Sequence, residues 1–250
     1  MKIKWQKKIL ENFDQAAHIY NANATLQRDI AWRLSKLCSQ QSIPKGLWLD
    51  LGSGTGLLAE SLESLNPNQE VLRIDSSKKM IDLQKSSAKK QIWDLNNGLP
   101  ILSGPPQLIA SSFALHWLNH PCERIKEWFN VLDNGGWLAL AIPINGSFAE
   151  WYEASNKANV PCTALELPST DDLVNSIDSK NIQHSQLIHT IQRSDGLTSL
   201  FKTMINIGAQ ASKYPSIKPS QWKRLQKAWP LTTNKEVSLT WLIQLLLIQK

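Results

Sequence analysis

A glycine-rich turn is the first feature of this sequence with the residue types and spacing to do chemistry. Gly52, Gly54 and Gly56 follow the apolar segment 47–51, which carries Asp50. Glycine accepts positive φ angles and has no Cβ to block a ligand. An apolar run of this length that ends in a turn is typical of a buried parallel strand. We therefore expect a small ligand to lie against the backbone of this turn.

The spacing of the glycines argues against a nucleotide phosphate. A dinucleotide fingerprint, G-x-G-x-x-G, needs its third glycine at position 57, where the chain has Leu57. The turn also lacks the lysine of a phosphate-binding loop. The pattern therefore favours a ligand with an amino-acid end and no pyrophosphate.

Histidine and cysteine are the other candidates for chemistry, and neither predicts a metal site. His116 and His120 are four residues apart, but a proline follows at once and no third ligand matches them. Cys38, Cys122 and Cys162 are far apart and odd in number, which suits neither a disulfide framework nor a C-x-x-C metal site. We expect reduced, mainly structural thiols and no metal.

The elements that must position the turn alternate between strand and helix. Breakers and caps separate the apolar segments, and a parallel sheet with helices on both faces follows from this alternation. Residues 5–39 have helical spacing, so we expect N-terminal helices over 1–40, and we expect 45–143 to form the ligand-binding core. The predicted strands are 47–51, 71–75, 91–95, 107–112 and 137–143, and the predicted helices between them are 55–65, 76–90 and 121–132.

The second half of the chain is less regular. Two further strands are predicted at 182–192 and 237–249, which brings the sheet to seven strands. Helices are predicted within 147–180, around a loop at 161–168, and at 196–211 and 219–229. We expect 147–180 and 196–230 to form a helical cap, and residues 1–250 to form a single domain.

Composition describes a globular protein with a localised basic excess. The chain has 250 residues, 42% of them hydrophobic, and a formal net charge of +6. Between positions 196 and 235 there are seven basic and no acidic residues, which leaves 20 of the 27 basic residues against 21 acidic ones elsewhere. An acidic partner is expected at this segment, although a solvated basic face would look the same. No apolar leader or membrane-length segment is visible, so the sequence predicts a cytoplasmic protein.

The motif "LDLGSGTG" resembles the first motif of class I S-adenosylmethionine-dependent methyltransferases. The resemblance implies that the turn holds the methionine part of S-adenosylmethionine, which the reaction converts to S-adenosylhomocysteine. It also implies that Asp75, at the end of the second strand, takes the ribose hydroxyls, and that Asp94 lies beside the adenine amino group. The full set of residues expected to bind this cofactor is Gln27, Asp50, Gly52, Ser53, Gly54, Gly56, Asp75, Ser76, Asp94 and Leu95.

Further blocks resemble one methyltransferase family. The segments 12–28, 114–121, 146–154, 200–210 and 224–230 are similar to BioC, the malonyl-acyl-carrier-protein O-methyltransferases of biotin synthesis. The resemblance implies a Rossmann-like α/β fold and methylation of the free carboxylate of a malonyl group. The partner it implies is an acidic acyl carrier protein, which the basic residues Lys202, Lys223, Arg224 and Lys227 are expected to dock.

Four residues are the candidates for the reaction itself: Tyr20, Arg28, His116 and Trp117. A carboxylate is already ionised at neutral pH, so no general base is required, and His116 is expected to hydrogen-bond or pack. A guanidinium offers paired donors to the malonyl carboxylate, for which Arg28, Lys202 and Arg193 are the candidates. Core packing remains an alternative role for Tyr20 and Trp117, as it does for Trp151.

The sequence departs from the superfamily at two positions and leaves three competing functions open. Gln107 stands where the superfamily usually begins its fourth strand with aspartate, and Ser53 replaces a common cysteine. The basic run would also suit a nucleic-acid methyltransferase, although the N-P-P-aromatic element of base methylation is missing after the fourth strand. A methyltransferase acting on a small free acid and a non-catalytic cofactor-binding subunit are the second and third of these functions.

Overall fold

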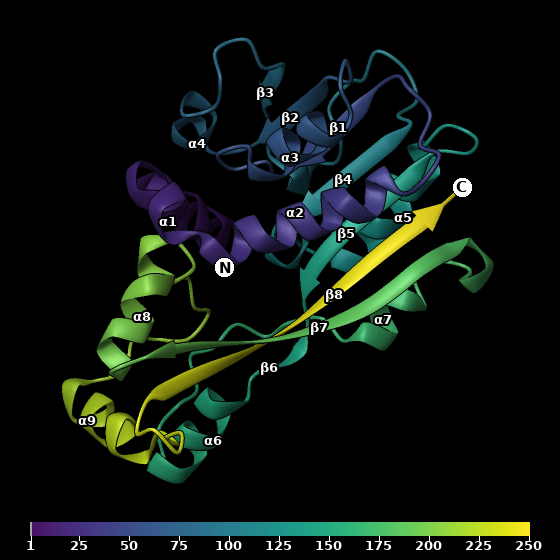
Figure 1. Cartoon of the computed structure of the whole chain (residues 1–250). Coiled ribbons are helices and arrows are strands. Elements are labelled where there is room, and N and C mark those ends of the chain that lie inside the picture. Colours follow the sequence, from purple (N-terminus) through teal and green to yellow (C-terminus); the bar gives the residue numbers. More distant parts are fainter. Residues whose placement is uncertain (1) are drawn as a thin grey trace.

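A seven-stranded sheet organises the protein (Figure 1). The computed structural model describes residues 2–250, so Met1 of the predicted first helical region lies outside it. The strand order is β3-β2-β1-β4-β5-β8-β7, and the first five of these strands run parallel. β8 is antiparallel to both β5 and β7. The predicted Rossmann-like, mostly parallel, seven-stranded fold is confirmed.

The parallel strands agree closely with the sequence prediction. They are β1 (Trp48–Leu51), β2 (Val71–Asp75), β3 (Lys90–Ile92), β4 (Leu108–Ser112) and β5 (Trp137–Pro143). β2 and β4 pair with opposite edges of β1, so the strand order reverses between β1 and β4, and this is where open α/β sheets bind ligands. The turn at 52–56 lies at the carboxyl end of β1.

Helices cover both faces of the sheet because alternate strand residues point to opposite sides. α2 (Thr25–Ser39) and α3 (Leu57–Leu65) pack on the face that holds Trp48 and Leu108. α5 (Pro121–Val131) and α7 (Thr170–Val174) pack on the face that holds Leu49 and Ile109. This period of two is what a strand buried on both faces requires.

A two-stranded ribbon carries helices beyond the sheet. β8 (Val237–Gln249) pairs with β5 only from Ile243 onward, whereas β7 (Ile182–Ser194) accompanies it to Val237. α8 (Leu197–Asn206) follows β7, α9 (Pro219–Ala228) precedes β8, and α6 (Ala149–Ala158) packs against α9. In Figure 1 these helices gather at the end of the ribbon, beyond the carboxyl end of β5, and α8 lies beside α1 (Lys2–Asn23).

Some predicted boundaries are wrong, and one strand was not predicted. The helix expected at 76–90 is only α4 (Lys78–Asp82), begun by Ser77, whose Oγ accepts from the Met80 N–H at 3.1 Å. The strand β6 (Asn145–Phe148) was not expected; the hydroxyl of Ser147 accepts from the Leu242 N–H, which holds β6 beside β8. The strand expected at 91–95 ends at Ile92, whereas α1 and α2 form the N-terminal helices that the sequence predicts. Short 3₁₀ helices also occur at Leu95–Asn97, Leu115–Trp117 and Ser179–Asn181.

None of the helices within residues 2–250 combines the length and the apolar character needed to cross a lipid bilayer.

Candidate active site

The glycine turn is built from left-handed backbone that a side chain would disturb. Gly52, Gly54 and Gly56 have φ angles of +72°, +52° and +93°. A Cβ on Gly52 would lie 2.2 Å from the Cβ of Ala114, whereas a Cβ on Gly54 would meet no atom within 4 Å. Position 52 therefore requires glycine both because of its positive φ angle and because a side chain would clash with Ala114. Gly54, in contrast, faces open space.

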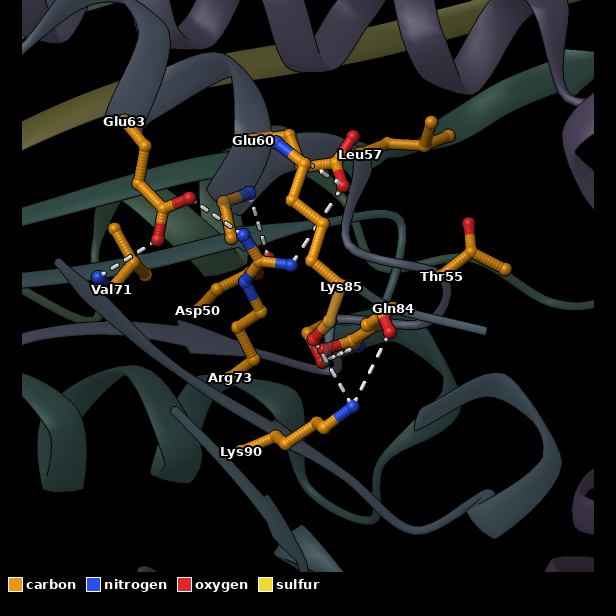
Figure 2. A network of polar contacts seen from close by, with 12 residues as sticks. Asp50, Thr55, Leu57, Glu60, Glu63, Val71, Arg73, Gln84, Lys85 and Lys90 are labelled. Carbon is orange, nitrogen blue, oxygen red and sulfur yellow. Dashed lines mark hydrogen bonds and ion pairs between the residues drawn. The ribbon is translucent and has the colours of Figure 1, made fainter. Parts of the chain in front are cut away.

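Gln84, which follows α4, and Arg73 of β2 lie beside the turn, and Figure 2 labels both side chains. Gln84 donates its side-chain amide to the Gly54 carbonyl at 2.7 Å and to Ser53 Oγ at 3.0 Å. The buried guanidinium of Arg73 pairs with Glu63 at 2.7 Å, and a Cβ on Gly56 would lie 2.9 Å from its Nη1. The turn is thus held in one conformation before any ligand arrives.

Gln107, which stands where the superfamily usually has aspartate, does not brace this turn. Its Oε1 accepts from the Leu47 N–H at 2.8 Å, and its Nε2 donates to Asp133 at 2.9 Å. Both partners lie at the start of the parallel strands, away from the ligand end of the sheet. Gln107 therefore joins the strand entrances, and Gln84 takes over the support of the turn.

Asp75 has two filled and two open positions. Its carboxylate accepts from the Gly54 N–H at 2.8 Å and from the Ser77 N–H at 2.7 Å. Burial raises the pKa of Asp75, and these two N–H donors lower it. An ionised carboxylate has about four acceptor sites, so about two remain for a ligand. That geometry suits a vicinal diol such as a ribose.

Asp94, which follows β3, is a second carboxylate with acceptor sites left for a ligand. Its Oδ1 accepts from both the backbone and the side-chain amide of Asn96 at 2.9 Å. The second carboxylate oxygen is left for a donor on the ligand, such as an exocyclic amino group.

One cavity of about 770 Å³ joins these groups. Of the ten residues predicted to bind the cofactor, the fold brings nine to its wall: Gln27, Asp50, Gly52, Ser53, Gly54, Asp75, Ser76, Asp94 and Leu95. Gly56 is the exception, because it caps α3 beneath the turn. We call this space the larger cavity. It is polar along the strand ends and can hold a nucleoside with an amino-acid tail.

A second cavity of about 410 Å³ adjoins the first. Its wall is mostly aromatic and aliphatic, including Phe113, Phe148, Trp151, Phe201, Met204, Trp222 and Trp241. We call it the smaller cavity. Five residues line both cavities and so form the junction between them: Phe13, Tyr20, Gln27, Phe113 and Trp117. Two of the candidates for the reaction, Tyr20 and Trp117, lie at this junction.

His116 lines the smaller cavity as a neutral group. Burial lowers the pKa of His116 to about 3, so the imidazole carries no charge at neutral pH. Its ring lies 5.0 Å from that of Trp117 and 6.5 Å from that of Phe113, measured between centroids. Its Nδ1 is buried without a hydrogen-bond partner among residues 2–250. His116 can pack or hydrogen-bond, whereas His120 is exposed near Glu123.

The three cations predicted for a bound carboxylate lie elsewhere. Arg28 is exposed and donates to the Asn21 carbonyl, and Arg193 and Lys202 are exposed on β7 and α8. None of them lines either cavity. Among the residues with described side chains, Lys8 of α1 is the only Lys or Arg on the wall of the smaller cavity. The sequence could not single it out, because four of the first eight residues are lysines.

The basic residues predicted to dock a partner are exposed on neighbouring helices. Lys223, Arg224 and Lys227 lie on α9, and Lys202 lies on α8. Arg224 also donates to the Asn159 carbonyl at 3.4 Å. The set forms a positive surface on the helices that surround the smaller cavity.

Asp50 gives a first prediction. Burial raises the pKa of Asp50 to about 7 from 3.8, despite the Ala59 N–H bond and Arg73. The folded state therefore favours the protonated form of Asp50. Its contribution to the free energy of unfolding falls as pH rises from 3.8 to about 7 and does not change further above that pH. We compare the melting temperature of Asp50→Asn with that of the parent at each pH. The difference, variant minus parent, should be about 5 °C larger at pH 8 than at pH 5.

Melting curves of both proteins across this pH range test the prediction. Asp195→Asn, which removes an exposed carboxylate, is the matched control and should shift melting equally at both pH values. A difference between Asp50→Asn and the parent that does not change with pH would contradict it.

Comparison with known proteins shows which enzymes the chain resembles. The family model described as a methyltransferase domain matches residues 49–140. A malonyl-[acyl-carrier protein] O-methyltransferase of Marinomonas sp. is 27% identical over 240 residues, which cover 88% of this chain and 85% of that protein. The biotin biosynthesis bifunctional protein BioCD of Bordetella avium is 30% identical over 220 residues, 83% of this chain and 45% of that protein.

Solved structures agree with the fold. A protein of Bacillus halodurans described as a methyltransferase has a TM-score of 0.61 at 15% identity, covering 87% of this chain and 98% of that one. Magnesium protoporphyrin IX methyltransferase of Synechocystis, solved with bound S-adenosylhomocysteine, has a TM-score of 0.53 at 12% identity, covering 92% and 85%. Together with the glycine turn and Asp75, the matched methyltransferase domain indicates S-adenosylmethionine as the cofactor. The chain is an S-adenosylmethionine-dependent O-methyltransferase that is similar along most of its length to malonyl-[acyl-carrier protein] O-methyltransferases.

Proposed function

We propose that the protein methylates the free carboxylate of a malonyl group carried by an acyl carrier protein, giving the malonyl methyl ester in biotin synthesis. The observation that carries this proposal is the junction of the two cavities. A donor on the strand ends would present its methyl group to an acceptor in the smaller cavity. The similarity to malonyl-[acyl-carrier protein] O-methyltransferases along most of the chain supports the same acceptor.

The residues around the junction suit an acceptor that needs no deprotonation. S-adenosylmethionine supplies an electrophilic methyl group on a positively charged sulfur. A carboxylate is ionised at neutral pH, so the protein must only align one oxygen with the methyl group and exclude water. Neutral His116 at the wall of the smaller cavity fits this requirement, because the reaction leaves it no proton to remove.

The reaction is tested by mass spectrometry of malonyl carrier protein after incubation with enzyme and S-adenosylmethionine. We expect the malonyl group to gain the mass of one CH₂. A carrier protein loaded with acetyl, which has no free carboxylate, is the control. Absence of the gain with the malonyl carrier would reject the proposal.

A methyltransferase for a small free acid is the second candidate, because the aromatic wall of the smaller cavity would also accept an apolar acid. The two are separated by the dependence on the carrier. Turnover of the carrier-bound acid at concentrations where the free acid does not react supports the first, and the reverse supports the second.

The basic surface of α8 and α9 gives a second prediction. A double variant, Lys223→Glu with Arg224→Glu, should raise the KM for the malonyl carrier about tenfold, because complementary charge mainly steers association. The affinity for S-adenosylmethionine should not change, since both residues lie outside the larger cavity. Steady-state kinetics and calorimetry measure the two quantities.

The control alters charge equally on another part of the surface. Lys126→Glu with Lys180→Glu changes two exposed lysines on α5 and on the 3₁₀ helix before β7. This variant should keep the parent KM at the same ionic strength. If both double variants raise KM alike, long-range net charge and not this docking surface is responsible.

A further inference from the structure

Two polar side chains reach the junction of the cavities without an assigned partner. Tyr20 lies in the last turn of α1, and Gln27 lies in the first turn of α2. Both residues line the larger and the smaller cavity. Gln27 is buried, with 8% of its surface exposed. No hydrogen bond joins the Tyr20 hydroxyl or the Gln27 amide to any residue whose side chain the structure describes, so both are available to a ligand.

The junction itself holds no cation among the described residues. Its other members are Phe13, Phe113 and Trp117. Lys8 lines only the smaller cavity and is exposed, so water screens its charge. Any acceptor carboxylate that reaches the junction therefore meets neutral donors first.

From this arrangement we propose that Tyr20 and Gln27 hold the acceptor carboxylate through neutral hydrogen bonds, in place of an ion pair. The proposal rests on the proposed function and deepens it. It assigns the contact with the reacting oxygens, for which the sequence favoured a guanidinium. It also reassigns Gln27, which the sequence placed with the cofactor, to the acceptor.

Charge balance explains why neutral donors suit this reaction. A carboxylate oxygen forms a bond to the methyl carbon while the carbon–sulfur bond breaks and its electron pair stays on sulfur. An anion and a cation become a neutral ester and a neutral thioether, and no proton moves. A lysine or arginine paired with the carboxylate would stabilise the charged ground state more than the less charged transition state. Neutral donors orient the oxygens at a smaller cost in reactivity.

The wall of the smaller cavity acts in the same direction. Phe148 and Trp241 lie with ring centroids 4.7 Å apart, and Trp151 and Phe201 lie 4.4 Å apart. Such a wall excludes water, so the reacting charges are poorly solvated before the reaction. Little solvation is therefore lost when these charges diminish in the transition state. Burial also raises the pKa of Tyr20 well above its usual range, which keeps the hydroxyl protonated as a donor.

The arrangement defines a class of acceptor. It takes one carboxylate joined to an apolar or thioester-linked body, because a second charged group would be buried against aromatic rings without a partner. An amine acceptor is disfavoured, since its methylation keeps a positive charge that the junction cannot neutralise. A malonyl thioester belongs to the favoured class.

Three variants test the assignment by binding and by rate. In the presence of S-adenosylhomocysteine, Tyr20→Phe and Gln27→Leu should each weaken calorimetric binding of the malonyl carrier about tenfold, as the loss of one hydrogen bond to a charged group does. Gln27→Lys should bind the malonyl carrier more tightly than the parent and yet lower kcat. Affinity for S-adenosylhomocysteine should stay unchanged in all three, which excludes a purely structural effect.

Gln15→Leu, on the exposed side of α1, is the matched control and should equal the parent in every measurement. The inference is overturned if Tyr20→Phe and Gln27→Leu bind the malonyl carrier like the parent, if they lose S-adenosylhomocysteine instead, or if Gln27→Lys raises kcat. Failure of the proposed function is a separate result, because there the parent itself would neither bind nor methylate the malonyl carrier.

Discussion

Replacing Asp75 by asparagine is expected to weaken binding of S-adenosylmethionine about 100-fold or more. The carboxylate accepts from the Gly54 and Ser77 N–H groups and keeps about two acceptor sites for ribose hydroxyls. An asparagine amide has only one acceptor oxygen. Its NH₂ group would face a backbone N–H donor or a ribose hydroxyl, with which it cannot replace the bond that the carboxylate oxygen accepts. Hydrogen bonds to a charged acceptor contribute about 1.5–3 kcal/mol each, so losing two of them accounts for the expected change.

Isothermal titration calorimetry measures this affinity, and Asp82→Asn is its control. Asp82 ends α4, is exposed, and pairs with Lys78 at 2.6 Å on the surface. Its replacement removes the same charge near the same element without touching the larger cavity. Equal affinities of Asp75→Asn and Asp82→Asn would show that Asp75 does not hold the ribose.

The second large effect is expected for Gly52→Ala, which should lower the melting temperature by about 6–12 °C. Left-handed backbone costs a non-glycine residue about 1–2 kcal/mol, and overpacking costs about 1–3 kcal/mol more. The clash is with the Cβ of Ala114 at 2.2 Å, which can move only with the end of β4. Cofactor affinity should fall as well, because the turn would shift away from the larger cavity.

Gly104→Ala controls for the loss of a glycine. Gly104 has no positive φ, and a Cβ there would meet nothing within 4 Å. Its melting temperature should lie within about 2 °C of the parent, as surface substitutions usually do. A Gly52→Ala protein that melts like Gly104→Ala would mean that the turn tolerates a side chain.

The parallel core was predictable because its signals are local. β2 and β5 have the residue ranges that the sequence predicts, since both are bounded by turns or breakers. The alternation of strand and helix fixes the parallel direction through the handedness of the crossover. The order of the strands could not be obtained in this way, because it depends on contacts between segments distant in sequence.

The end of α4 shows where local signals fail. Helical pattern alone extends this helix to about residue 90, but it ends at Asp82. Gln84 turns inward from there to support Ser53 and Gly54, and its side chain is buried at 4% exposure. A tertiary hydrogen bond to the glycine turn thus replaces further helix, and helical propensity does not report it.

The fold brings together the residues expected at the cofactor better than those expected at the acceptor, for a physical reason. Its residues follow strand ends, so their place in the sequence sets their place in space, and nine of the ten line one cavity. The smaller cavity draws on α1, α6, α8, α9 and the loops between them. Chemical suitability favoured Arg28 as a carboxylate partner, but its side chain turns to the Asn21 carbonyl instead.

A crystal structure with S-adenosylhomocysteine tests the central claim most directly. The account predicts the two ribose hydroxyls on the Asp75 carboxylate, the amino-acid end against Gly52 and Gly54, and the sulfur facing the junction at Phe113 and Trp117. A ligand bound outside the larger cavity, or a ribose without contact to Asp75, would contradict it.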